Sequence, residues 1–189
     1  MIAVIMLGYR NSSILVIEKG ELTRGATGDL GFARMVQKIQ TFTSGQKAEH
    51  LIPVICQARD KLGKRVLETL VRSQRQELRQ KEVEEIAEAI ADARGEYVAL
   101  LQNWLLQHLP TQTKIDEFII SGGTARYLQR ELTEVLKDFG GSLNWCHSLE
   151  ERILKTFGET VSHHSLESRL ADVYGLFYKL CLLYTSPSP

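Results

Sequence analysis

Three glycine-containing segments of the chain carry residue types that can bind a ligand. The first is GYRNSS at positions 8–13, between two apolar runs. Gly8 allows a tight turn and a close approach of the backbone to a ligand. Asn11 and Ser12 add amide and hydroxyl groups which, together with backbone N–H groups, can hold a phosphate. The alternative is an ordinary hairpin turn, which favours the same residue types.

The second segment is GATGDLG at positions 25–31, which runs into a helical pattern. Backbone N–H groups at the N-terminus of a helix attract anions, so this segment can also face a phosphate. The alternative is a plain loop in which Asp29 caps the helix. The segment lacks the Gly-Lys-Ser/Thr ending of a Walker A loop.

The third segment is SGGTA at positions 121–125, at the point where an apolar strand becomes a helix. Gly122 and Gly123 lie side by side, and paired glycines cost backbone entropy, so something is expected to approach the main chain there. Ligand sites in α/β sheets lie at the carboxyl ends of strands, which is where this segment falls. Close packing of the strand against the helix is the alternative, and the segment is not a dinucleotide fingerprint.

The elements around these segments predict an α/β fold. The run at positions 2–7 is continuously apolar, as in a strand covered on both faces. Ile14–Ile17 and Glu21–Arg24 follow as strands, with Lys19-Gly20 as the turn between them, which makes an antiparallel meander. Helical spacing then recurs at four apolar positions, Phe32, Met35, Val36 and Ile39.

The remainder of the chain alternates helices with two further strands. Helices are expected over 48–81, interrupted by Pro53 and Gly63, and over 83–109, ending at Pro110. A strand at 115–120, a helix at 124–138, a short strand after Gly141 and a final helix at 165–180 follow. We therefore expect a mixed sheet with helices on both faces and a helical insertion.

The expected domain organisation has three parts. Residues 1–45 and 82–183 form the core, and residues 46–81 form the insertion, a charged helical subdomain. Residues 184–189 (TSPSP and the residue before it) form a tail that is either non-native or disordered.

Composition limits the classes of partner. The 23 basic and 23 acidic side chains cancel, which gives no argument for direct binding to nucleic acid or to a membrane. The three cysteines, Cys56, Cys146 and Cys181, are odd in number and form no Cys-x-x-Cys, which fits a reducing cytoplasm and argues against a structural zinc site. No apolar run has transmembrane length, and no metal site is expected.

Taken in order, the stretches VIMLGYRNSSILVIEKGEL, TGDLGF, FIISGGTARYLQREL and RLADVYGLFYKL resemble the second half of an actin-like ATPase. The likeness is greatest to the ParM-like plasmid-segregation family, and it covers about residues 2–180. The resemblance implies a ribonuclease H-like fold that binds ATP and Mg²⁺ in the full-length protein. It also implies that phosphates face the first segment and adenosine the third, which makes six cofactor-binding residues: Gly8, Asn11, Ser12, Gly122, Gly123 and Thr124.

The resemblance further implies a C-terminal domain fragment of a bacterial actin-like, ATP-binding protein. Such a protein assembles into homo-oligomeric filaments and moves plasmid or other DNA through a DNA-binding adaptor, with Asp29 near the phosphates. On this interpretation Gly122→Val in the full-length protein abolishes ATP binding and leaves the fold intact. The full-length parent is expected to be an ATPase and this chain alone to be inactive.

The sequence departs from the family pattern at Met6. The superfamily carries an aspartate two residues before the glycine of this hairpin, and a thioether cannot replace a carboxylate as a ligand of Mg²⁺. The first half of the family fold, with its own phosphate hairpin, is also absent. Two alternatives therefore stay open: a catalytically inactive scaffold with the same fold, and half of a small-molecule kinase of the superfamily.

Overall fold

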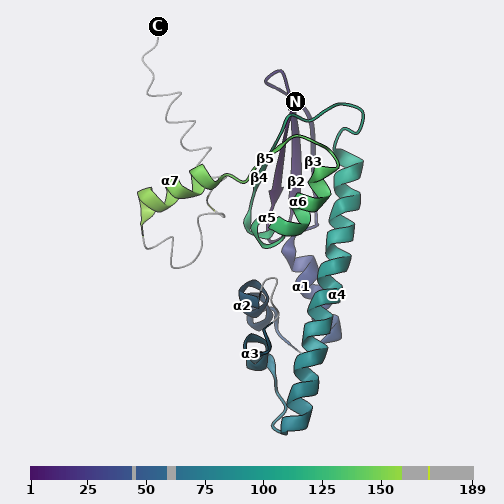
Figure 1. Cartoon of the computed structure of the whole chain (residues 1–189), viewed down its shortest axis with the longest axis vertical. Coiled ribbons are helices and arrows are strands. Elements are labelled where there is room, and N and C mark those ends of the chain that lie inside the picture. The colour runs from purple at the N-terminus through teal and green to yellow at the C-terminus, as the bar shows by residue number, and fades with distance from the viewer. Residues whose placement is uncertain (44–45, 59–62, 159–169, 171–189) are drawn as a thin grey trace.

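The computed structural model describes residues 1–43, 46–58, 63–158 and 170, and it contains a five-stranded mixed sheet (Figure 1). The strand order is β3-β2-β1-β4-β5. β1 pairs antiparallel with β2, and β2 with β3, whereas β1 with β4 and β4 with β5 pair parallel. The predicted α/β fold with an antiparallel meander is thus confirmed. The strands are β1 (Ile2–Leu7), β2 (Ser12–Glu18), β3 (Glu21–Gly28), β4 (Glu117–Ser121) and β5 (Ser142–Asn144).

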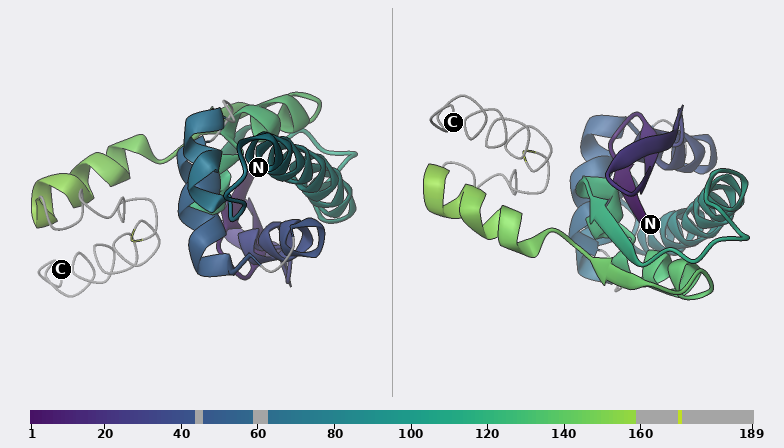
Figure 2. Two further views of the ribbon diagram at one scale, coloured as in Figure 1. Left: turned by 90° about the horizontal axis from the view of Figure 1, so that it is seen from below. Right: turned by 90° about the horizontal axis from the view of Figure 1, so that it is seen from above.

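Helices occupy most of the remaining described residues. They are α1 (Phe32–Phe42), α2 (Ala48–Ala58), α3 (Lys64–Leu67), the 3₁₀ turn η1 (Glu68–Leu70), α4 (Gln76–His108), α5 (Gly123–Tyr127), α6 (Gln129–Lys137) and α7 (His147–Phe157). Figure 2 shows α7 projecting sideways from the sheet and the other helices. Among these helices none is both long and apolar enough to cross a membrane.

Three helix boundaries differ from those expected. Residues 71–75 were expected to be helical but are not, and residues 76–81 belong to the long helix α4, which begins at Gln76 instead of residue 83. The helix expected at 124–138 is divided at Leu128, where φ −99° and ψ 21° separate α5 from α6. The helix α7 was not anticipated, and Ile153 is its one buried residue. The helix expected at 165–180 lies outside the described residues except for residue 170.

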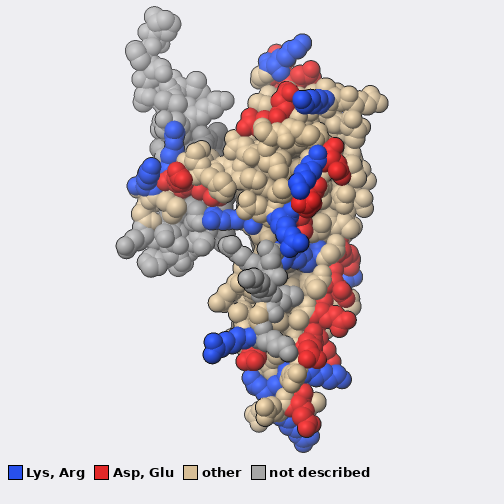
Figure 3. All heavy atoms as spheres, viewed as in Figure 1, with Lys and Arg blue, Asp and Glu red and all other residues tan. Residues whose placement is uncertain are grey.

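The start of α4 is tied to the segment before it by the Glu82 carboxylate. This carboxylate accepts the backbone N–H groups of Arg72 at 3.0 Å and Ser73 at 3.1 Å. Desolvation pulls the pKa of Glu82 upward, but these hydrogen bonds together hold it below its ordinary value. Lys, Arg, Asp and Glu side chains gather along the part of α4 that extends beyond the sheet (Figure 3), where they form a solvated helix face.

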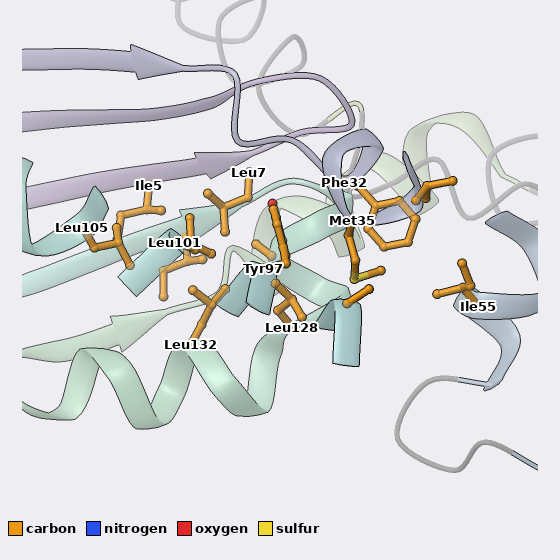
Figure 4. Close-up of a cluster of buried hydrophobic side chains, with 14 of the residues drawn as sticks. Ile5, Leu7, Phe32, Met35, Ile55, Tyr97, Leu101, Leu105, Leu128 and Leu132 are labelled. Atoms are coloured by element: carbon orange, nitrogen blue, oxygen red, sulfur yellow. The ribbon is translucent and has the colours of Figure 1, made fainter. Parts of the chain in front are cut away.

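The hydrophobic core lies between one face of the sheet and the helices α1, α4 and α6. Side chains alternate along β1, so that Ile5 and Leu7 are fully buried while Val4 and Met6 point to the other face and are half-buried. Figure 4 shows the buried side chains of β1 pointing toward those of α4 and α6. The core residues of these two helices include Ile90, Tyr97, Leu101, Leu105, Leu132 and Leu136.

We expect Gly95→Ala to stabilise the protein. A Cβ at Gly95, inside α4, meets nothing within 4 Å, so the alanine raises helix propensity without a collision. The free energy of unfolding in urea should rise by about 0.5–1 kcal/mol. Gly20→Ala is the matched control, because its site is equally open but has φ +86°, and it should destabilise the protein by about 1 kcal/mol. Equal effects of the two substitutions would contradict this account.

Candidate functional site

The three glycine-containing segments meet at one edge of the sheet. β1 and β4 run parallel and remain paired as far as Met6 and Ser121, so both strands end at the same place. The turn after β1 and the Gly122-Gly123 corner after β4 therefore lie beside each other. The loop that ends at Gly31 also reaches this place, because the first backbone N–H groups of α1 donate to carbonyls of the turn after β1. This edge is the carboxyl end of the parallel strands, where ligand sites form in α/β sheets.

The carbonyl oxygen of Gly8 connects all three segments. It accepts a hydrogen bond from the Thr124 hydroxyl at 2.7 Å and another from the backbone N–H of Phe32 at 3.2 Å. The next carbonyl, that of Tyr9, accepts the N–H of Ala33 at 2.8 Å. The turn after β1 is consequently held between the first residues of α1 and those of α5.

The N-terminus of α1 is not available to an anion in the way the second segment suggested. Its first N–H groups already donate to the carbonyls of the turn after β1. The cap residue is Gly31, whose added Cβ would lie 2.3 Å from the Tyr9 carbonyl oxygen. The prediction that Asp29 caps this helix is wrong, because Asp29 is exposed and its carboxylate lies 3.6 Å from the guanidinium of Arg34. Close packing of the main chain of Gly31 against the main chain of Tyr9 and Arg10 explains why the second segment ends in a glycine.

Packing also explains why residue 122 is glycine. Gly122 has φ +100°, which side chains disfavour, and an added Cβ would lie 2.3 Å from the carbonyl oxygen of Leu7. The alternative of close packing between strand and helix therefore accounts for Gly122 without a ligand. Gly123 is the first residue of α5 and faces the cavity described next.

A cavity of about 610 Å³ opens at this edge of the sheet. Four of the six predicted cofactor-binding residues line it: Gly8, Gly122, Gly123 and Thr124. The structure thus brings together two segments that are far apart in the sequence, on the two sides of one hollow.

Asn11 and Ser12, the other two predicted residues, do not line the cavity. Asn11 is exposed, and its carbonyl accepts the N–H of Gly8 at 2.9 Å. Ser12 is fully buried, and its hydroxyl donates to the Leu30 carbonyl at 2.5 Å, which also accepts the Tyr97 hydroxyl at 2.7 Å. Burial raises the pKa of Tyr97, against a lowering by the hydrogen bond with Ser12, so the phenol stays protonated and keeps donating. The Ser12 hydroxyl is a structural group here.

Aromatic and apolar side chains form the rest of the cavity wall, and none of them was predicted to bind a ligand. They are Met6, Leu7, Tyr9, Phe32, Ile52 and Tyr127, with the thiol of Cys56 beside them. No charged side chain is among the lining residues. Ile52 and Cys56 come from α2, inside the predicted insertion, so this segment forms one side of the hollow.

Tyr127 is held firmly in the wall by its neighbours. Its ring meets that of Phe32 edge-to-face, with centroids 5.1 Å apart, and the Arg94 guanidinium lies 4.8 Å from its centroid. Arg94 also forms an ion pair with Glu131 at 2.7 Å. The signal that identifies Tyr127 in the sequence is its place four residues after Gly123, one helical turn along α5.

The cavity does not provide the ligands that Mg²⁺ requires. Met6 lines it at the position where the resemblance implied an aspartate, and no carboxylate is among the lining residues. Within the residues that the structure describes, no group of three or more His, Cys, Asp or Glu side chains could hold a metal ion. The donor set therefore does not fit Mg²⁺, which prefers carboxylate oxygens.

Comparisons with known proteins address the fold. No protein-family model matches the chain, and no curated protein matches it in sequence. Among solved structures, ParM of Bacillus thuringiensis with ATP is similar at 16% identity with a TM-score of 0.52, over 95% of this chain and 47% of that one. The ethanolamine utilization protein EutJ from Carboxydothermus hydrogenoformans is 16% identical, with a TM-score of 0.43, over 76% and 44% of the two chains.

Component A of (R)-2-hydroxyglutaryl-CoA dehydratase from Acidaminococcus fermentans is 11% identical, with a TM-score of 0.39, over 75% of this chain and 54% of that one. The chain thus spans about half, or less, of the length of each of these proteins. At such low identity the likeness to ParM shows the fold alone. The chain has the actin-like ATPase fold.

We expect Gly122→Ala to destabilise the protein by about 3 kcal/mol or more, because the new Cβ collides with the main chain of β1. The expectation that Gly122→Val spares the fold is revised for the same reason. Gly140→Ala is the matched control, since Gly140 also has a positive φ, +69°, but open space around it, and it should lose only about 1 kcal/mol. Urea unfolding measures both, and equal losses would rule out the collision.

Proposed function

We propose that the chain is one half of an actin-like ATP-binding protein and that its cavity receives the adenosine part of the nucleotide. The observation that carries this proposal is the shared hollow between the turn at Gly8 and the corner at Gly122-Gly123. Its volume of about 610 Å³ lies within the range of small-molecule sites. An uncharged, partly aromatic wall suits a flat purine base and would not by itself hold a triphosphate.

The phosphates of the nucleotide would extend past Gly8 along the turn at positions 8–11. Backbone N–H groups can bind phosphate oxygens there, and Arg10 is exposed in the same turn. ATP, when bound, would supply the phosphoryl group, while the residues of this chain hold the base and orient the turn. Because the cavity offers no carboxylate, no step through Mg²⁺ is assigned to this chain.

The wider role proposed for the full-length protein follows the resemblance to the ParM-like family. ParM of Bacillus thuringiensis has been crystallised with ATP and with ADP, and this chain spans 47% of each of those chains. We propose that the other half closes the nucleotide between two domains. Closure then favours head-to-tail assembly into filaments that move plasmid or other DNA through an adaptor.

A second candidate function is a catalytically inactive scaffold. It would have the same fold but would neither bind nor hydrolyse a Mg²⁺-nucleotide. The observation that favours it is Met6, whose side chain occupies the cavity wall in place of a carboxylate. The two candidates differ in nucleotide binding, which the next two experiments measure.

Adenosine should protect Cys56 from alkylation. Cys56 is exposed and lines the cavity, so a bound nucleoside would cover its thiol. With adenosine at about ten times its dissociation constant, the rate of alkylation by iodoacetamide should fall about tenfold, because only the unliganded fraction reacts. Mass spectrometry of the tryptic peptides gives this rate, with Cys146, which does not line the cavity, as the internal control. Equal rates at Cys56 with and without adenosine would refute the nucleoside site.

Cys56→Trp should weaken adenosine binding by about tenfold or more, because the indole fills part of the cavity. Gln57→Trp is the matched control, since Gln57 is the next residue of α2, is exposed, and does not line the cavity. Isothermal titration calorimetry measures both affinities. Identical affinities in the two variants would place the nucleoside elsewhere.

A further inference from the structure

We propose that Thr124 is a positioning residue: its hydroxyl couples the turn at Gly8 to the corner at Gly122-Gly123, so that the two halves of a bound nucleotide reinforce each other. The inference rests on the proposed function, since it concerns the same cavity. It adds a division of roles, in which Thr124 acts on the phosphate-facing turn through a carbonyl group and does not need to touch the ligand with its hydroxyl.

The contact that supports this proposal joins residues that are 116 positions apart in the sequence. The Thr124 hydroxyl donates to the carbonyl oxygen of Gly8 at 2.7 Å, and Thr124 is only 3% exposed. A hydroxyl has a single proton to donate, so this bond uses the donor capacity of the side chain. The β-branched side chain has few rotamers, which keeps the hydroxyl aimed at Gly8.

Thr124 provides the tighter of the two hydrogen bonds that hold this carbonyl. The other donor, the backbone N–H of Phe32, lies at 3.2 Å, near the long end of the usual range. If the hydroxyl is removed, the Gly8 carbonyl keeps one longer bond, which comes from α1 and not from the corner. The turn then remains attached to the protein but loses the hydrogen bond that links the Gly8 carbonyl to the side of the cavity formed by Gly122 and Gly123.

This connection matters for a ligand that binds both sides. A nucleoside contacts the corner, whereas a nucleotide also contacts the turn. The contact with the turn adds to the affinity gained at the corner only if the two surfaces are held at a fixed distance. Loosening the turn should therefore lower the affinity for ATP by a larger factor than the affinity for adenosine, because only the phosphates contact the turn. Uniform destabilisation of the fold would lower both affinities together.

The test compares Thr124→Val, which keeps the shape and removes the hydroxyl, with Thr124→Ser, which keeps the hydroxyl. Thr43→Val is the matched control, because Thr43 is also buried, at 4% exposed, and its hydroxyl donates to the Ile39 carbonyl at 2.8 Å, away from the cavity. Dissociation constants of the 189-residue chain for adenosine and for ATP are measured by calorimetry, with the free energy of unfolding determined in parallel.

For Thr124→Val we expect the ratio of ATP to adenosine affinity to fall by about tenfold. Thr124→Ser should restore the ratio, and Thr43→Val should leave it unchanged even if stability falls. An unchanged ratio in Thr124→Val, which includes an equal loss of both affinities, would overturn the positioning role while leaving the nucleoside site in place. A parent chain that binds neither ligand would instead refute the proposed function, and the positioning role with it.

Discussion

The parallel pairing of β1 with β4 is the constraint on which the candidate site depends. Because the two strands stay in register until Met6 and Ser121, the segments that follow them must turn away from the sheet at the same point. An antiparallel partner would have placed the glycine corner at the opposite edge. The chain reaches this pairing only after the intervening helices, and the long helix α4 covers the same sheet face that α5 and α6 then complete.

Most of the contacts that join the site are made by main-chain atoms. The carbonyl of Leu7 packs against Gly122. The carbonyl of Gly8 accepts hydrogen bonds from Thr124 and Phe32, and that of Tyr9 accepts one from Ala33. Main chain can approach main chain this closely only where a Cβ is missing, which is why Gly31 and Gly122 are needed. Side chains enter mainly as the wall of the cavity, where Phe32 and Tyr127 support each other. The site is therefore a backbone framework with an aromatic lining.

Sequence patterns predicted the strands and turns that depend on neighbouring residues. They did not predict side-chain roles that depend on contacts with distant parts of the chain. The strand β1, the turn at Lys19-Gly20 and the strand before Gly122 were all predicted, because each depends on residues close in sequence, whereas the expectation that both faces of β1 are covered was not met by its half-buried Val4 and Met6. The roles of Asp29 and of the Ser12 hydroxyl were not, since the first lies outside the cap and the second is directed to Leu30 by burial. No local signal shows that α2 supplies Ile52 and Cys56 to the cavity, because that contact depends on the path of the chain through residues 46–58.

The long sequence separation between the two sides of the cavity also has a consequence for the order of folding. The meander and the helices as far as His108 leave the ribosome before β4, and contacts between distant residues form late because closing a long loop is entropically unfavourable. Until β4 arrives, the edge of β1 that it will cover has unpaired N–H and C=O groups between apolar side chains, an arrangement that favours aggregation. A nascent chain that stalls before residue 117 therefore exposes the hydrogen-bonding edge of β1 that β4 covers in the folded protein.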